Sequence, residues 1–458
     1  MLKKYLICLL ATLISYQLSA QFSFDQQKLK QYLEIQSQRI GFNGSVFISK
    51  DKRSVFTSHV GLASVELSVH INRNSTFALA SISKSFTAAL TLIAVTEGKL
   101  KLSDSLAIFF PELTDAQWRG ITIHQLLSHQ SGMPHNEGIA EYFISKSTQS
   151  FTRAQAITEI LSLKLIAKPG SNTKYSSPGY FLLATILENI YKKGYGQLIQ
   201  EKINTSLKLQ NTGQLNNRII VQNLVQGYAQ VNDQLTVAPY RSYSLMKGSG
   251  DMYSSGEDLL RLLDHFSMLD IQPDLRNKMF NAQSQAPVER GDYYGYGWFL
   301  RAKNENQPKA FYHGGGSYGV STLMASYPEE NLSIVILNNV SVIPVNEIWS
   351  DIEKIVLGKS FDLPVIRKSV ELSIEDLSHF SGVYMHENGM SLQIISQDGR
   401  LYAKMGNNSA FEIFCEKPNY FYGKKVSIDL IFELGTNKQI TSLRTTGNGR
   451  EFNFTKKQ

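Results

Sequence analysis

The chain of 458 residues is 42% hydrophobic, 19% charged and 11% aromatic. At roughly 150 residues per domain, this length predicts more than one domain, and the composition excludes a disordered, collagen-like or coiled-coil protein. The net charge is +7, which falls to +5 once the two lysines Lys3 and Lys4 are removed. The basic residues form no stripe interleaved with aromatic ones, so we expect no nucleic-acid partner.

Residues 1–20 are predicted to be an export signal. Lys3 and Lys4 give a basic start, Tyr5 to Tyr16 is mostly apolar, and Leu18-Ser19-Ala20 offers small residues for cleavage. This apolar part is shorter than the ~20 residues that span a membrane, and the alternative is an ordinary first helix of the fold. We expect an exported protein, periplasmic or secreted. No later stretch is long and apolar enough to predict a membrane span.

Cysteine is scarce in the sequence. Cys8 lies inside the predicted signal, so the mature protein keeps only Cys415. A lone cysteine excludes an internal disulfide. Cys8 also lies too early in the signal to be a lipid-anchor cysteine at the cleavage point.

The first elements in chain order are a helix within 22–40 and a hairpin of Gly44–Ser49 and Arg53–Val60. Ser81–Glu97 is predicted to be a helix that Gly98 ends, and because it is apolar nearly all round, we expect it to be buried. The signals then stay mainly helical to about residue 270. Late β-rich runs precede one more helix: Tyr296–Arg301, Ala310–His313, Val320–Tyr327 and Leu332–Asn338, then the helix Val345–Leu357.

This order predicts an α+β fold. Strands at both ends of residues 21–360, with helices between them, favour one antiparallel sheet flanked by helices and carrying a helical insert. Residues 361–370 are predicted to be a linker. Residues 371–458 contain about eight short β-rich runs separated by turn signals such as Asp398-Gly399, which predicts a small antiparallel β-barrel, either filled or holding a small ligand.

Ser81 and Lys84 are the first candidates for chemistry. They lie three positions apart at the start of the predicted buried helix, and therefore on one face. A serine hydroxyl needs a base, and a lysine amine can serve if burial and nearby positive charge lower its pKa. The alternative is an N-capping serine with a solvated lysine. Against it, a lysine in an apolar helix is costly unless it has a role.

Two further segments could complete such a site. Tyr175 lies in a loop before an apolar helix and could carry protons if it lay beside a lysine; a serine-capped helix start is the alternative. Tyr312-His313 precedes the glycines at 314–316, whose backbone could pair with an extended substrate or stabilise an oxyanion. A glycine-rich turn between two strands is the alternative there.

These segments, in this order, resemble the serine β-lactamases and penicillin-binding proteins. The nearest branch is that of class C β-lactamases, D-alanyl-D-alanine carboxypeptidases and esterases. Residues 371–458 resemble the lipocalin-like barrel appended to some members. Further segments that carry the resemblance are Thr76-Phe77, Leu126–Pro134, Gly248–Ser254 with Asp258-Leu259, and Tyr294–Trp298.

The resemblance implies an acylated nucleophile at Ser81, its base partner at Lys84 and a proton-shuttling tyrosine at Tyr175. It also implies an oxyanion hole formed by the backbone N–H groups of Ser81 and Gly316. We therefore expect an exported serine hydrolase that forms an acyl-enzyme with an ester, D-amino-acid peptide or β-lactam substrate. The alternative is a penicillin-reactive sensor with little turnover. We expect no cofactor and no metal, and the sequence makes no prediction of oligomeric state.

The expected substrate-binding residues depart from the family pattern. Ser177 stands where the family has asparagine, and His313, Gly314 and Gly315 stand where many members have Lys-Thr-Gly. Near pH 7 a histidine carries at most a partial positive charge. Both changes predict weaker binding of a penicillin or a peptide carboxylate, with the acylation chemistry intact.

Two other interpretations are weaker. Ser317 lies in a Gly-x-Ser-x-Gly sequence like that of α/β-hydrolases, but a predicted strand follows it where that motif needs a helix. His124, His129 and His135 lie near one another in the sequence without a metal-binding motif. We interpret them as hydrogen-bonding residues of loops and helix ends.

Overall fold

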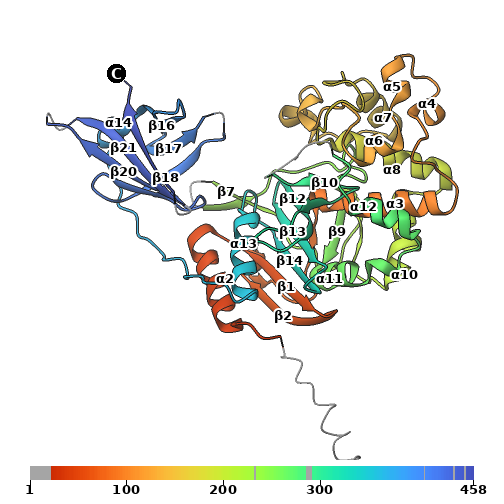
Figure 1. Cartoon of the computed structure of the whole chain (residues 1–458), viewed down its shortest axis with the longest axis horizontal. Coiled ribbons are helices and arrows are strands. Elements are labelled where there is room, and N and C mark those ends of the chain that lie inside the picture. Colours follow the sequence, from red (N-terminus) through yellow and green to blue (C-terminus); the bar gives the residue numbers. More distant parts are fainter. Residues whose placement is uncertain are drawn as a thin grey trace, which may run out of the picture.

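We describe a computed structural model of the chain that covers residues 22–231, 234–284, 291–406, 408–436, 439–447 and 450–457. The predicted export signal lies outside these residues. Figure 1 shows a large body of sheet and helices and, beside its α2 and α13 helices, a smaller barrel. No helix in the described ranges has the length and apolar character that crossing a membrane requires.

The large body is built on a seven-stranded antiparallel sheet. Its first and last strands in the sequence meet in the middle, where Gly44 pairs with Asn338. Asp51 and Lys52 both have positive φ, as the tight turn of the first hairpin requires. The predicted sheet closed by both ends is confirmed. Its order is β10 (Tyr293–Tyr294), β11 (Phe299–Arg301), β12 (Ala310–Ser317), β13 (Val320–Tyr327), β14 (Leu332–Asn338), β1 (Gly44–Lys50) and β2 (Arg53–Val60).

Apolar side chains alternate along β1 and fill both sides of this sheet. Val46 and Ile48 pack with helices α2 (Gln26–Ile40) and α13 (Val345–Val356), whereas Phe47 packs on the opposite side with the helical part. A central strand with both faces covered is therefore apolar throughout. Arg301 and Glu353, both buried, form an ion pair between β11 and α13.

The helical part centres on α3 (Ser83–Thr96), which is buried almost all round, as predicted. Gly98 follows it in the left-handed conformation. The other helices are α4 (Leu106–Phe109), α5 (Ala116–Gly120), α6 (Ile123–Leu127), α7 (Arg153–Leu161), α8 (Ser177–Tyr191), α9 (Tyr195–Ile199), α10 (Thr205–Leu207), α11 (Gly256–His265) and α12 (Pro273–Met279). Short helical turns lie at Ala80–Ile82, Asn136–Gly138, Tyr142–Lys146, Gln200–Asn204 and Phe266–Met268.

Three small antiparallel sheets complete the large body. They pair β3 (Leu62–Ser64) with β4 (Val69–His70), β9 (Met252–Ser255) with both β5 (Thr76–Ala78) and β6 (Gly213–Gln214), and β7 (Tyr228–Val231) with β8 (Gln234–Val237). The β5–β9 pairing matters for the site, because it fixes the segment before Ser81 against the segment that follows Gly248.

The second body is a closed barrel, which confirms the predicted architecture. Its core is formed by buried apolar side chains, including Leu377 and Phe380 of α14 (Ile374–Phe380). The strands are β15 (Gly382–Met385), β16 (Ser391–Gln397), β17 (Arg400–Met405), β18 (Phe411–Lys417), β19 (Tyr420–Gly423), β20 (Asp429–Leu434), β21 (Ile440–Gly447) and β22 (Arg450–Lys456).

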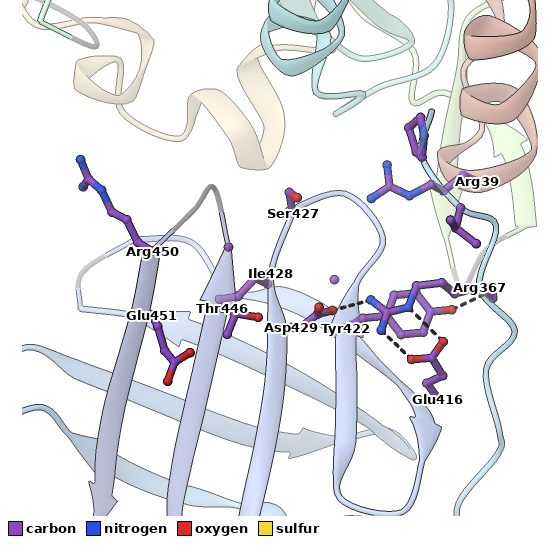
Figure 2. Close-up of a pocket in the computed structure, with 14 residues that line it drawn as sticks. Arg39, Arg367, Glu416, Tyr422, Ser427, Ile428, Asp429, Thr446, Arg450 and Glu451 are labelled. Atoms are coloured by element: carbon purple, nitrogen blue, oxygen red, sulfur yellow. Dashed lines mark hydrogen bonds and ion pairs between the residues drawn. The ribbon is translucent and has the colours of Figure 1, made fainter. Parts of the chain in front are cut away.

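The segment between the two bodies is fastened at both ends. Phe361 packs edge-on against Tyr32 of α2, with ring centroids 5.5 Å apart. Arg367 forms ion pairs with Glu416 and Asp429 of the barrel, and its guanidinium lies 4.4 Å from the ring centroid of Tyr422 (Figure 2). A cavity of about 750 Å³ lies around these barrel residues.

Candidate active site

Ser81 lies in the short helical turn Ala80–Ile82 that leads into α3. Ala80, directly before it, has a φ of 47°, a conformation that costs energy for a residue with a Cβ. Ser81 does not cap α3, because the start of that helix has no side-chain cap. The alternative of a capping serine is therefore wrong. Ser81 is half-buried and lines a cavity of about 410 Å³.

Lys84 is fully buried beside Ser81. Its Nζ lies 3.1 Å from the Oγ of Ser81, and it donates hydrogen bonds to the Oγ of Ser177 at 3.0 Å and to the carbonyl of Ser249 at 2.9 Å. Burial lowers the pKa of Lys84 well below its usual value, and the positive charge of Arg241 lowers it further. The solvated lysine of the alternative interpretation is therefore wrong, and the environment favours an unprotonated amine.

Ser249 belongs to a turn that Asp251 fixes. The Oδ1 of Asp251 accepts a hydrogen bond from the backbone N–H of Gly248 at 2.8 Å, and its Oδ2 accepts one from Gln214 at 2.8 Å. Burial raises the pKa of Asp251 to about 7. The turn thus presents the Ser249 carbonyl to Lys84.

Tyr175 lies next to this pair, at the end of the loop before α8. The Nζ of Lys84 is 4.7 Å from the centroid of its ring. The ring of His129 packs on one side, with centroids 4.3 Å apart, and the ring of Phe299 is stacked at 6.2 Å. The sequence expectation of a tyrosine beside a lysine is met in space, while its role as a proton carrier stays a prediction.

The next two residues join the loop to α8. Ser176 is the N-cap of α8 and accepts a hydrogen bond from the backbone of Gly179 at 3.3 Å. A serine-capped helix start is therefore present at this motif. It turns the following residue, Ser177, toward Lys84.

Two histidines hold this loop by accepting hydrogen bonds from its backbone. The N–H of Ser176 donates to Nδ1 of His129, and the N–H of Ser177 donates to Nδ1 of His135, both at 3.1 Å. Burial lowers the pKa of His129 well below its usual value and that of His135 to about 3, so both rings are neutral near pH 7. His124 instead hydrogen-bonds the hydroxyl of Tyr296 at 2.7 Å. The hydrogen-bonding interpretation of the histidines is confirmed.

The glycines at 314–316 are part of strand β12, so the interpretation as a turn is wrong. At Gly315 a Cβ would lie 2.1 Å from the carbonyl oxygen of Leu79, a contact that no side chain tolerates. β12 can therefore approach the segment before Ser81 closely, and Thr322 of β13 adds a hydrogen bond of 3.0 Å to the same carbonyl. Gly316 is exposed and lines the cavity of Ser81.

His313 lines the same cavity but is buried. Its Nδ1 lies 2.7 Å from the carbonyl of Gly314, so Nδ1 carries the proton and Nε2 accepts from the hydroxyl of Tyr294 at 3.2 Å. Burial lowers its pKa to about 3. His313 is therefore neutral near pH 7 and gives the cavity no positive charge.

Ser317, the alternative nucleophile, ends β12 and is followed by strand β13. Its Oγ accepts a hydrogen bond from Arg241. The elbow geometry is absent at this position. Among the residues that the structure covers, none form a group of three or more His, Cys, Asp or Glu side chains suited to a metal ion.

Sequence reasoning missed several residues around the cavity. Asn346 at the start of α13 lines it, and a second cavity of about 510 Å³ shares Gly314, Gly316 and Asn346 with it. Arg241 lines the second cavity. It lies in a loop with no motif, and only the chain's path brings it near Lys84, so the sequence carried no signal for it. Ser249 lay inside a quoted segment, but its contribution is a backbone carbonyl.

Comparisons with known proteins identify the family of the large body. The profile of the family described as beta-lactamase matches residues 27–347. Penicillin-binding protein 4* of Bacillus subtilis (strain 168) is 26% identical over 434 residues, which cover 90% of this chain and 94% of that protein. The family profile thus spans the large body from α2 to the start of α13.

Solved structures show the same fold. The octameric penicillin-binding protein homologue from Pyrococcus abyssi aligns with a TM-score of 0.66 and 22% identity, over 94% of this chain and 100% of its own. A D-stereospecific amidohydrolase from Streptomyces sp. aligns with a TM-score of 0.63 and 21% identity, over 73% of this chain and 100% of its own. Because the beta-lactamase profile matches residues 27–347, more than half of its length, the chain belongs to the beta-lactamase family, which includes penicillin-binding proteins and other serine hydrolases.

Proposed function

We propose that the protein is an exported serine hydrolase that acts through an acyl-enzyme on Ser81. The observation that carries the proposal is the buried Nζ of Lys84, 3.1 Å from the Oγ of Ser81, in surroundings that lower the pKa of the amine. A neutral amine at this distance can take the proton of the serine hydroxyl as the oxygen attacks a carbonyl carbon.

The reaction proceeds in two halves. In the first, the Oγ of Ser81 bonds to the carbonyl carbon, and the negative charge on the carbonyl oxygen is stabilised by the backbone N–H groups of Ser81 and Gly316. The carbonyl–leaving group bond then breaks, and Tyr175 passes the proton to the leaving atom. In the second half, a water oxygen bonds to the carbonyl carbon of the ester on Ser81, and the bond between the Oγ of Ser81 and that carbon breaks. The proton lost by the water passes through Lys84 and Tyr175 to the Oγ of Ser81, and the acid leaves.

The substrate class is an ester, a D-amino-acid amide or peptide, or a β-lactam. We favour an ester or a D-amino-acid amide, because Ser177 is short and His313 is neutral, which leaves no cation in the position of the family's lysine. Gly314, Gly315 and His313 would border the substrate backbone along β12. The proteins of similar fold include a D-stereospecific amidohydrolase, and this name is compatible with a D-amino-acid amide as the substrate.

Mass spectrometry of the intact protein tests the proposal. A fluorophosphonate should add once to the wild-type protein and not to Ser81→Ala, whereas Ser317→Ala should still be labelled. Labelling of Ser81→Ala at the wild-type rate would overturn the assignment. Incubation with a penicillin and with a D-amino-acid amide then separates the alternatives, since a sensor retains one acyl group and a hydrolase releases product repeatedly.

A further inference from the structure

The second cavity contains a single kind of charge. Among the described residues that line it, Arg241 is the one cation near pH 7, and none is an aspartate or glutamate. Its rim is apolar, with Phe143 61% and Val342 71% exposed. A cavity of this kind would attract an anionic group carried on an otherwise apolar chain.

The guanidinium of Arg241 has only neutral partners. It donates to the hydroxyl of Tyr142 at 2.9 Å and to the Oγ of Ser317, and it lies 5.5 Å from the ring centroid of Tyr318. These two hydrogen bonds come from Nη1 and Nη2, whereas Nε is buried and has no hydrogen-bond partner among the described residues. Nη1 and Nη2 each carry a second N–H besides the one given to Ser317 or Tyr142. Two such donors side by side can bind a carboxylate through two parallel hydrogen bonds.

The backbone that carries this side chain is fixed on both sides. The carbonyl of Arg241 accepts a hydrogen bond from Asn217 at 2.8 Å, and the N–H of Ser242 donates to the carbonyl of Ser147 at 2.9 Å. The guanidinium is thus held in place before any ligand arrives, which lowers the entropic cost of binding.

The position of the cavity indicates which part of a substrate it would receive. Tyr175 and His313 line the first cavity and not the second, while Gly314 and Gly316 of β12 border both. The leaving group must lie within reach of the proton that Tyr175 delivers. The acyl part, which stays on Ser81, then extends along β12 into the second cavity.

We propose that Arg241 binds a carboxylate at the far end of the acyl part of the substrate, so that the enzyme prefers acyl groups that end in a negative charge. This proposal rests on the proposed acylation of Ser81. It adds a specificity-determining residue outside the motif positions and narrows the substrate class to acyl groups with a terminal carboxylate.

The test compares two series of nitrophenyl esters of equal chain length. One series is the adipate, pimelate and suberate monoesters, and the other is the hexanoate, heptanoate and octanoate esters. Wild-type kcat/KM should favour the carboxylate series by about tenfold or more at one length, and Arg241→Met should bring this ratio to about one. Arg241→Lys should keep part of the preference, because a point charge replaces the fork.

The decisive quantity is the ratio of kcat/KM for the carboxylate esters to kcat/KM for the alkyl esters of the same length. Arg241 also lowers the pKa of Lys84, so Arg241→Met should slow both series together, and only the preference reports on the carboxylate. Arg53→Met, at an exposed position of β2, removes the same charge away from the cavity and should leave the preference unchanged. Binding of adipate to Ser81→Ala, measured by calorimetry, should weaken with Arg241→Met in the same background.

An equal ratio in wild-type protein and Arg241→Met overturns the carboxylate site, provided that a fluorophosphonate still labels Ser81 in both. Loss of adipate binding by the Arg53→Met control would likewise overturn it, since the effect would then be one of net charge. If the fluorophosphonate does not label Ser81 even in the wild-type protein, the proposed function fails instead. The Arg241 site is then tested by adipate binding alone, and equal affinity with and without Arg241→Met overturns it.

Discussion

The Nζ of Lys84 donates a hydrogen bond of 3.0 Å to the Oγ of Ser177, the residue that replaces the family's asparagine. The short hydroxyl therefore lies against the proposed base, and not only at the edge of the substrate cavity. Because Ser177 is the first residue of α8 and is buried, its side chain has little freedom to move away. The replacement of asparagine by Ser177 therefore changes the hydrogen bonding of Lys84 itself.

Ser177→Ala should lower kcat by about fivefold, because it removes one neutral hydrogen bond worth roughly 1 kcal/mol. Lys84 keeps its partners at Ser81 and Ser249, so the protein should still be acylated. Ser177→Thr, which keeps the hydroxyl, is the matched control. Steady-state kinetics on a nitrophenyl ester give the measurement, and equal kcat values for wild type and Ser177→Ala would show that this contact has no part in catalysis.

Lys84 and Tyr175 should act as one proton-transfer unit. Lys84→Ala and Tyr175→Phe should each lower kcat by a factor of about 10²–10⁴. The kcat of the double variant should be only slightly lower than that of the less active single variant. Single-turnover acylation rates of the wild type, the two single variants and the double variant form the thermodynamic cycle. Nearly normal turnover in Tyr175→Phe would leave Lys84 as the base without the tyrosine.

Asp251 should make the folded protein less stable as the pH rises toward neutral. Unfolded, this carboxyl loses its proton near its ordinary pKa of about 3.9, whereas folded Asp251 keeps it up to about 7. Its stabilising contribution is complete below pH ~4 and is lost as the pH rises to about 7, by up to a few kcal/mol.

Urea unfolding of wild type and Asp251→Asn at several pH values measures this effect. The difference in unfolding free energy, wild type minus variant, should fall between pH ~4 and 7. The histidines with lowered pKa values act in the opposite direction in part of this range, but they are present in both proteins and cancel. A difference that does not change with pH would contradict the raised pKa of Asp251.

The barrel should be dispensable for acylation, because none of the described residues that line either active-site cavity belongs to it. A chain that ends after Leu363 keeps Phe361 and Leu363, which pack against the α2 side of the sheet. We expect it to melt cooperatively and to be labelled at Ser81 by a small fluorophosphonate at the wild-type rate.

Comparing that truncated chain with the full-length protein on a nitrophenyl ester and on a longer D-amino-acid peptide separates the possible roles of the barrel. Slower cleavage of the peptide alone would mean that the barrel shapes specificity. A cooperative melt without labelling of Ser81 would refute the barrel as an independent unit, and the division at residues 361–370 with it.

The sequence predicted the bounds of the strands better than those of any other part of the fold. β13 and β14 begin and end where their β-rich runs predict, and the hairpin of Gly44–Ser49 with Arg53–Val60 was readable from its two β-rich runs. The glycines of β12 lie on a strand, as one of the two interpretations predicted. The sequence left a turn open as the alternative, because it does not reveal that the carbonyl of Leu79 lies against Gly315.

The site was predictable only as far as its motif residues. Ser81 and Lys84 follow from helical spacing, and their distance confirms that they share a face. Arg241 and Asn346 reach the site through long-range folding of the chain, so neither spacing nor periodicity marks them. The sequence therefore predicted that Lys84 would need burial and a nearby positive charge. It did not predict which residues supply that charge and the hydrogen bonds.

The pairing of β1 with β14 has a consequence for the order in which the protein forms. The middle of the sheet cannot form until both Gly44 and Asn338 have been synthesised, because β1 pairs with β14. Until then, the apolar β1 hairpin of the growing chain lacks its partner strand. The barrel, whose strands pair mostly with their neighbours in sequence, has no such delay. A chain that ends after the helical part would thus keep an open edge at β1, and such an edge can pair with other chains.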